Sequence, residues 1–357
     1  MNVINYIRKY KNLTFKDMRM TEVDKAIFAV LSYIRYDGLV SNNSFNKRTI
    51  REVGNEYFKS TTRKDMKKNI IGIRAAISIF KEIKDTKRYG DLLLYNDIYI
   101  GDESSQFSAV CIEISPFLTY VSFEGTDELL SGWEEDCRMA YKFPVEAQSY
   151  AIKYLNKHFT IAPTNIIVGG HSKGGNLALV SAMYANRIVR HKIREVYSYD
   201  GQGLRQKQIE SLKYKRLKSK YTHVVPNNSI VGMLLRNDGD NIVVKTNTVP
   251  GFSHNIMTWQ IDDISFKRTK LNKNSENFNK RFTMWLTKYT DEERKLFVDE
   301  IFKVLRENNI VSLKDIMNNY MLIFNIVKST NTIDQVVKDM TKDLINILIK
   351  SEKKVNE

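Results

Sequence analysis

The sequence predicts an α/β protein with a mostly parallel, doubly wound sheet, helices before it and a helical appendage after it. Short apolar runs rich in β-branched residues alternate with segments of helical spacing from about residue 119 to residue 246, as in sheets whose parallel strands are joined by helices. After residue 271 only helical spacing remains. We therefore expect an α/β domain over residues 1–270, which includes an N-terminal helical layer, and a C-terminal helical region over residues 271–357.

The N-terminal part is predicted to be helical. Apolar residues recur every three to four positions in the first forty residues and again over residues 65–84. Thr21, followed by acidic residues, has the position of a helix N-cap, and the polar segment 42–60 is predicted to be a loop. We expect these helices to form a packing layer.

The strands begin at Leu92, where the apolar period changes to two. Turn residues at Asn96-Asp97 and Gly101-Asp102 predict three antiparallel strands, over residues 92–95, 98–100 and 107–114. The later predicted elements are strands over 119–123, 166–168, 195–199, 221–225 and 241–246, and helices over 147–158, 177–184, 278–289, 292–308, 313–328 and 333–349, with a basic helix after residue 203.

Composition and charge exclude several classes of protein. Cys111 and Cys137 are the only cysteines, so no disulfide framework or metal-ligand spacing can be built from them. The first residues lack a signal-peptide core and no apolar run approaches a membrane span, so we expect a cytoplasmic protein. The net charge of +15 includes basic clusters over residues 59–88 and 205–220, but no nucleic-acid-binding motif accompanies them. We interpret them as solvated helix faces, with weak contact to an anionic membrane surface as the second interpretation.

One motif indicates chemistry. Gly170-His-Ser-Lys-Gly174 lies between an apolar strand and a run of good helix formers, which is the context of a nucleophile elbow. Such a turn raises a serine hydroxyl above the sheet edge and needs small residues two positions before and after it, as Gly170 and Gly174 are. The helix start also points N–H groups at the serine. Ser172 is therefore the predicted nucleophile of an α/β-hydrolase.

A serine nucleophile needs a histidine base and an acid that orients it. Of five histidines, His254 alone follows Ser172 in the loop after the last strand, where this fold places its base. Asp200 ends a strand and precedes a glycine-rich turn, which favours it as the acid. Asp238 and Asp240, in a later polar loop, are the competitors.

The oxyanion formed in acyl transfer needs two hydrogen-bond donors. The N–H of Lys173, next to the nucleophile, is one candidate. The second is Thr126, through its backbone and in part its hydroxyl, in the Gly125-Thr126 loop after an earlier strand. His171 also adjoins the serine, but we expect its side chain to point away across the turn. No metal or organic cofactor is required by this chemistry.

These segments resemble class 3 lipases. Residues 123–127 (Phe-Glu-Gly-Thr-Asp) match the family's oxyanion loop, and residues 132–136 (Gly-Trp-Glu-Glu-Asp) match its D-W-x-x-D-like segment. The elbow makes the chain most similar to a bacterial lipase-like group that carries G-H-S-K-G-G-N. The resemblance implies an α/β-hydrolase fold and cleavage of lipid or acyl esters.

Three positions depart from the family. Ser229 stands where class 3 lipases place the triad acid, Glu124 where an arginine is usual, and Lys173 where the elbow has an apolar residue. Lys173 is expected either to form a cationic lip that favours anionic substrates or to point into solvent.

Two functions follow from these residues. The first is a serine hydrolase in which Ser172 attacks an ester, His254 transfers the proton and Asp200 orients the imidazole. The second is a non-catalytic module that keeps the fold and binds a ligand or partner. The Ser172 and His254 pair favours the first, and the absence of the usual lipase acid favours the second.

Overall fold

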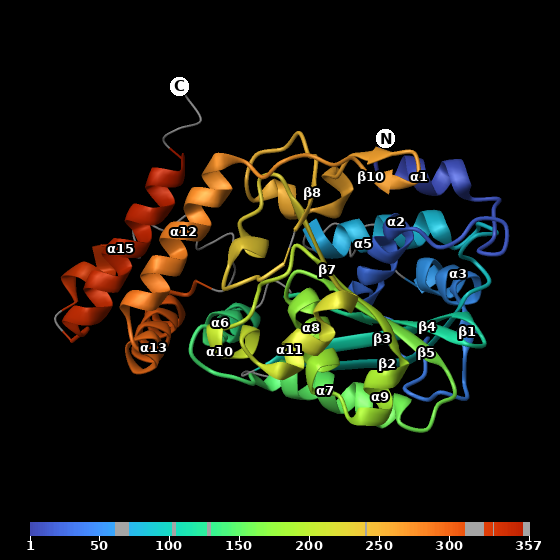
Figure 1. The fold of residues 1–357 in the computed structure, drawn as a ribbon, viewed down its shortest axis with the longest axis horizontal. Coiled ribbons are helices and arrows are strands. Elements are labelled where there is room, and N and C mark those ends of the chain that lie inside the picture. Colours follow the sequence, from blue (N-terminus) through green and yellow to red (C-terminus); the bar gives the residue numbers. More distant parts are fainter. Residues whose placement is uncertain are drawn as a thin grey trace.

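The centre of the molecule is an eight-stranded sheet, seen in a computed structural model that describes residues 1–60, 71–101, 105–126, 130–239, 241–310, 325–330 and 332–352. The strand order follows the chain from β1 to β8 (Figure 1). Neighbours are antiparallel from β1 to β4 and parallel from β4 to β8. The strands are β1 Arg48–Thr49, β2 Leu93–Gly101, β3 Gln106–Ser115, β4 Leu118–Phe123, β5 Asn165–His171, β6 Ile193–Tyr199, β7 Tyr221–Pro226 and β8 Ile242–Val244.

Helices cover both faces of the sheet (Figure 1). Because the strand order never reverses among the parallel strands, right-handed crossovers place their helices on one face. These helices are α7 Glu146–Phe159, α8 Lys173–Tyr184, α9 Arg187–Lys192, α10 Gln206–Ile209 and α11 Leu212–Leu217. The other face is covered by the N-terminal elements α1 Val3–Tyr10, α2 Glu22–Ala29, the 3-10 turn η1 Leu31–Tyr33 and α5 Ile71–Ile83. The predicted N-terminal packing layer is therefore confirmed.

Two local predictions are wrong. The segment predicted as a loop over residues 42–60 contains helix α3 Ile50–Ser60, whose apolar positions Ile50, Val53 and Tyr57 are buried but too sparse to stand out among polar neighbours. The predicted turn at Asn96 is a bulge inside the continuous strand β2, where Asn96 takes a φ of 53°. Asp102 and residues 65–70 lie outside the described residues.

The C-terminal helices form a separate apolar core. They are α12 Lys273–Lys288, α13 Asp291–Glu307 and α15 Gln335–Glu352, and most of the helix predicted over 313–328 lies outside the described residues. Their core includes Trp285, Phe297 and Val337, and it extends to Trp133 on α6 Leu130–Arg138. Within the described ranges, no helix is both long and apolar enough to span a membrane. The division at residue 270 stays a prediction.

Candidate active site

Ser172 stands in the turn between β5 and α8 with φ 58° and ψ −134°, a backbone conformation that non-glycine residues rarely adopt. The turn is closed by direct backbone packing. A Cβ on Gly170 would lie 2.3 Å from the carbonyl carbon of Gly174, and one on Gly174 would lie 2.1 Å from the Phe123 oxygen. Neither position accepts a larger residue without moving backbone. This strand, strained serine and helix have the backbone geometry that a nucleophile elbow requires, within the predicted α/β-hydrolase fold.

Asp200 and His254 are hydrogen-bonded to each other. Asp200 follows β6 and is fully buried, and His254 lies in the 3-10 turn η4 Phe252–His254 after β8. The His254 Nδ1–H donates to Asp200 Oδ2 at 2.7 Å, and the His254 side chain keeps 26% of its surface exposed. A carboxylate that accepts from Nδ1 fixes the tautomer in which Nε2 is the free proton acceptor.

The other carboxylate oxygen of Asp200 is also satisfied. Ser229 Oγ donates to Asp200 Oδ1 at 2.5 Å and the Gly232 N–H donates at 3.1 Å. Burial raises the pKa of the Asp200 carboxyl. The hydrogen bond and charge of His254, together with the hydrogen bond from the Ser229 hydroxyl, lower it by more, so the pKa of Asp200 lies below its usual value. Ser229, which stands where class 3 lipases carry their acid, therefore supports the carboxylate of Asp200, which follows the preceding strand.

Of the two competing acids, Asp238 is not at this site. Asp238 is exposed and pairs with Lys218 at 3.2 Å. Asp240 lies outside the described residues.

Ser172 adjoins the acid through the backbone. Its N–H donates to Tyr199 O at 2.9 Å, one residue before Asp200, and a Cβ on Gly201 would lie 2.6 Å from Ser172 O. Ser172 is only 7% exposed, and within the described residues its Oγ forms no hydrogen bond with His254. Catalytic hydrogen bonds commonly tighten only when substrate is bound.

The Gly125-Thr126 loop, which follows β4, passes beside the serine, since a Cβ on Gly125 would lie 2.8 Å from Ser172 Cβ. Thr126 Oγ1 donates to Asp136 Oδ2 at 2.5 Å, and burial raises the pKa of the Asp136 carboxyl to about 6. The Thr126 hydroxyl is thus engaged. Over the described ranges the amide N–H groups of Thr126 and Lys173 have no acceptor, which leaves both as donors for an oxyanion.

Both expectations for the Lys173 side chain are wrong. It is fully buried, and its Nζ donates to Glu135 Oε2 of α6 at 2.7 Å. A buried ammonium group requires a paired, hydrogen-bonded partner, which this carboxylate supplies. Glu135 also accepts from Ser105 Oγ and from the Ala147 N–H. Lys173 therefore joins the elbow to α6 instead of forming a cationic lip.

A family model described as Mbeg1-like matches residues 83–303, more than half of the chain. The chain belongs to the Mbeg1-like family. A solved structure titled "Crystal structure of M37 lipase" is also similar, with a TM-score of 0.36 and 16% sequence identity over 58% of this chain and 67% of that one. No curated protein matches the sequence. The Mbeg1-like region includes Thr126, Ser172, Asp200 and His254.

Sequence reasoning missed two residues of the Mbeg1-like region that support the site. Asn176, in the quoted elbow motif, donates to Gly203 O at 2.7 Å and accepts from Gln148 Nε2, which fixes the turn after Asp200. His171 does not stand apart as expected, because its ring packs against the His254 ring with centroids 4.3 Å apart. Asn176 could have been found from its place in the elbow motif. No sequence signal indicates the contact between the His171 and His254 rings.

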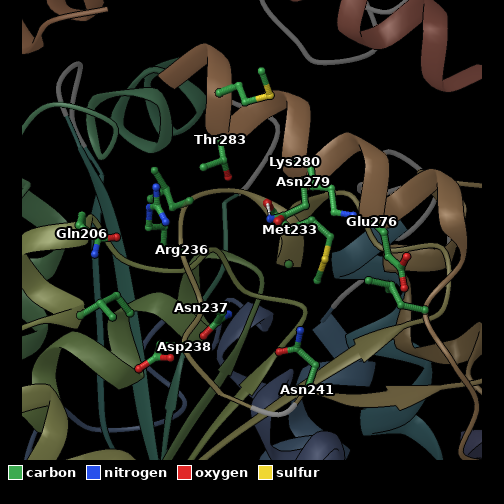
Figure 2. A pocket seen from close by; sticks show the side chains of 15 residues that line it. Gln206, Met233, Arg236, Asn237, Asp238, Asn241, Glu276, Asn279, Lys280 and Thr283 are labelled. Atoms are coloured by element: carbon green, nitrogen blue, oxygen red, sulfur yellow. Dashed lines mark hydrogen bonds between the residues drawn. The ribbon is translucent and has the colours of Figure 1, made fainter. Parts of the chain in front are cut away.

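A hollow of about 760 Å³ lies between α12 and the loops that follow β6 and β7 (Figure 2). Gly232, whose N–H donates to Asp200, lies in its wall. Its polar lining includes Gln206, Arg236, Asn237, Asn241, Asn279 and Thr283. Neither Ser172 nor His254 lines this hollow of the Mbeg1-like protein, so it is distinct from the candidate active site.

Proposed function

We propose that the protein is a serine hydrolase of the lipase or esterase type that cleaves a carboxylic ester. The observation that carries the proposal is the hydrogen bond between Asp200 and His254 beside a serine held in a strained elbow. A fold that used the elbow only for packing would have no reason to bury a carboxylate against a partly exposed histidine.

The proposed reaction is acyl transfer through Ser172. Its Oγ attacks the ester carbonyl while His254 Nε2 takes the hydroxyl proton, and the same proton passes to the departing alkoxide. The Lys173 and Thr126 N–H groups stabilise the oxyanion, and Asp200 stabilises the imidazolium. Water, deprotonated by His254, then releases the acid and restores Ser172.

Lipid or acyl esters are the proposed substrates. The resemblance to class 3 lipases supports this class. The loop that carries His254 supports it further, because Val249 and Phe252 are each 59% exposed there. Apolar side chains beside a base favour the approach of an apolar acyl chain.

A non-catalytic binding module is the second candidate. It is favoured by the low exposure of Ser172 and by the absence, within the described part of the chain, of a hydrogen bond between its hydroxyl and His254. Labelling with a serine-reactive probe separates the two functions.

Intact-mass labelling with an alkyl fluorophosphonate tests the proposal. We expect one adduct on the wild type, because an activated serine attacks phosphorus, no adduct on Ser172→Ala, and labelling slowed by orders of magnitude on His254→Ala. Ser78→Ala, which changes an exposed helix serine, is the matched control and should label like the wild type. A folded wild type that stays unlabelled, with and without lipid vesicles, would favour the binding module.

We also propose that the protein is cytoplasmic and that the α9–α11 surface contacts anionic membranes. Lys213 of α11 lies 3.9 Å from the ring centre of Tyr184, the last residue of α8, so α11 lies against the end of α8, two residues before α9 begins. Ile188 on α9 and Leu212 on α11 are 52% and 68% exposed among basic side chains. Exposed apolar residues within a basic surface match an anionic bilayer.

Co-sedimentation with vesicles tests the membrane contact. We expect binding to phosphatidylglycerol vesicles that weakens with salt and falls at least about tenfold in the Lys213→Glu/Lys215→Glu variant, since each basic residue contributes about 1 kcal/mol near such a surface. Lys295→Glu, a basic position on α13, is the control. Equal binding to phosphatidylcholine vesicles, or none to either, would contradict the proposal.

A further inference from the structure

The N-terminal layer reaches the candidate active site through Tyr33. This residue ends η1, is 3% exposed, and its hydroxyl lies 3.1 Å from His171 Nδ1. A Cβ on Gly125 would lie 2.0 Å from the same hydroxyl. Tyr33 thus touches both the elbow and the oxyanion loop, which is more than a packing role requires.

The second nitrogen of His171 contacts the proposed base. His171 Nε2 lies 2.7 Å from the backbone oxygen of His254. A carbonyl oxygen only accepts, so Nε2 carries a proton and donates. Burial, together with the nearby His254, lowers the pKa of His171 to about 3, so the ring is neutral and Nδ1 is a bare acceptor. The direction of both bonds follows: the Tyr33 hydroxyl donates to His171, and His171 donates to His254.

The turn that carries His254 is anchored at Ser253, whose Oγ donates to Asn228 O at 3.1 Å and whose carbonyl oxygen accepts from Trp259 Nε1 at 2.8 Å. The backbone of His254 itself is held less directly by this turn. The His254 N–H reaches Gly251 O at 3.4 Å, a long bond, and Gly251 has a φ of 87°. On the side chain, the Asp200 bond fixes one ring nitrogen but not the position of the backbone from which the ring extends. The short bond from His171 and the ring contact supply that second anchor.

We propose that Tyr33 and His171 are positioning residues that hold the backbone of His254 so that its ring stays between Asp200 and Ser172. This inference rests on the proposed function. His171 packs against the His254 ring but hydrogen-bonds only to the backbone oxygen of His254, and Tyr33 acts through His171. The N-terminal helical layer therefore takes part in the site from a segment that precedes the region matched by the family model.

Kinetics of fluorophosphonate labelling provide the first test. His171→Leu removes the donor, and the maximal labelling rate is expected to fall about 100-fold with unchanged probe affinity, because a displacement of about 1 Å costs that much. His171→Gln places an amide N–H near the position of Nε2 and should recover most of the rate. Tyr33→Phe should lose less than His171→Leu, since the His171 bond to His254 remains.

Controls separate positioning from folding. Tyr10→Phe removes a hydroxyl that bonds Asp263 outside the site, and His158→Leu removes a histidine at the end of α7, so both should label like the wild type. Thermal melting of each variant reports the fold. A folded His171→Leu that labels within twofold of the wild type, or a Gln variant as slow as the Leu variant, would overturn the inference.

A measurement that does not depend on catalysis distinguishes this inference from the proposed function. The His254 Nδ1–H proton, held by Asp200, should give a slowly exchanging NMR signal in the wild type. We expect that signal to be lost to rapid exchange with water in His171→Leu and retained in His171→Gln, whether or not any probe reacts. An unchanged signal in His171→Leu would refute the positioning role even if Ser172 proved catalytic.

Discussion

Replacing Asp200 with Asn is expected to reduce the maximal rate of Ser172 acylation by about 10⁴-fold while the protein remains folded. The amide keeps the shape of the carboxyl group and can still accept from the Ser229 hydroxyl. It carries no charge to stabilise the His254 imidazolium, and its NH₂ group favours the wrong imidazole tautomer. The measurement is the rate of labelling by the fluorophosphonate, followed by turnover of whichever ester proves to be a substrate.

Asp238→Asn is the matched control, because this competing acid is exposed and paired with Lys218, and its substitution should leave the rate unchanged. A loss smaller than tenfold in Asp200→Asn would show that Asp200 is not the triad acid. A large loss in Asp238→Asn would move the assignment to the later loop.

The difference in stability between the wild type and Asp200→Asn should depend on pH. The pKa of Asp200 is lowered in the folded protein, so its ionised form stabilises the fold at pH values above the unfolded pKa of about 3.9, and this contribution is lost as the pH falls through the folded value. The difference in melting temperature between wild type and Asp200→Asn should therefore shrink on acidification. A difference that grows as the pH falls would contradict this sign.

The local parts of the site could be predicted from the sequence because they are contiguous in it. The elbow needs only a strand, two close-packed glycines and a helix, all within residues 165–184. Asp200 could be selected because the carboxyl ends of parallel strands share one edge of the sheet. His254 followed from chain order. Each of these predictions rests on a general rule of the fold and does not require the distances between the residues to be known.

The supporting contacts could not be predicted, because they join residues far apart in the chain. Tyr33 and His171 are 138 positions apart, and Glu135 and Lys173 are 38 apart. A lysine is almost never fully buried without a partner. Because the sequence does not show that Glu135 lies beside Lys173, it favours an exposed Lys173 side chain. Ser229 was noticed as a missing acid, although its hydroxyl supports the acid that is present.

Lys173→Met is expected to destabilise the protein by about 3–5 kcal/mol, the usual result of removing one partner of a buried ion pair. The variant would leave the Glu135 carboxylate fully buried without its cation. Glu135 also accepts from Ser105 and Ala147, so the effect should extend to α6 and the start of α7. Urea unfolding at neutral pH measures the change.

The double variant Lys173→Met/Glu135→Gln should recover much of this loss. The neutral amide needs no counter-charge, and its oxygen can still accept from the Ala147 N–H. Lys218→Met, which breaks an exposed pair with Asp238, should change stability far less and serves as the control. A single variant as stable as the wild type would show that the pair contributes nothing to the fold.

The double variant also separates the two roles of Lys173. In the proposed reaction it contributes its backbone N–H, which methionine retains, so a folded double variant should label Ser172 at a rate close to that of the wild type. If the labelling rate falls with the fold restored, the buried charge itself affects the oxyanion. In that case the Lys173–Glu135 pair would belong to the catalytic chemistry as well as to the core.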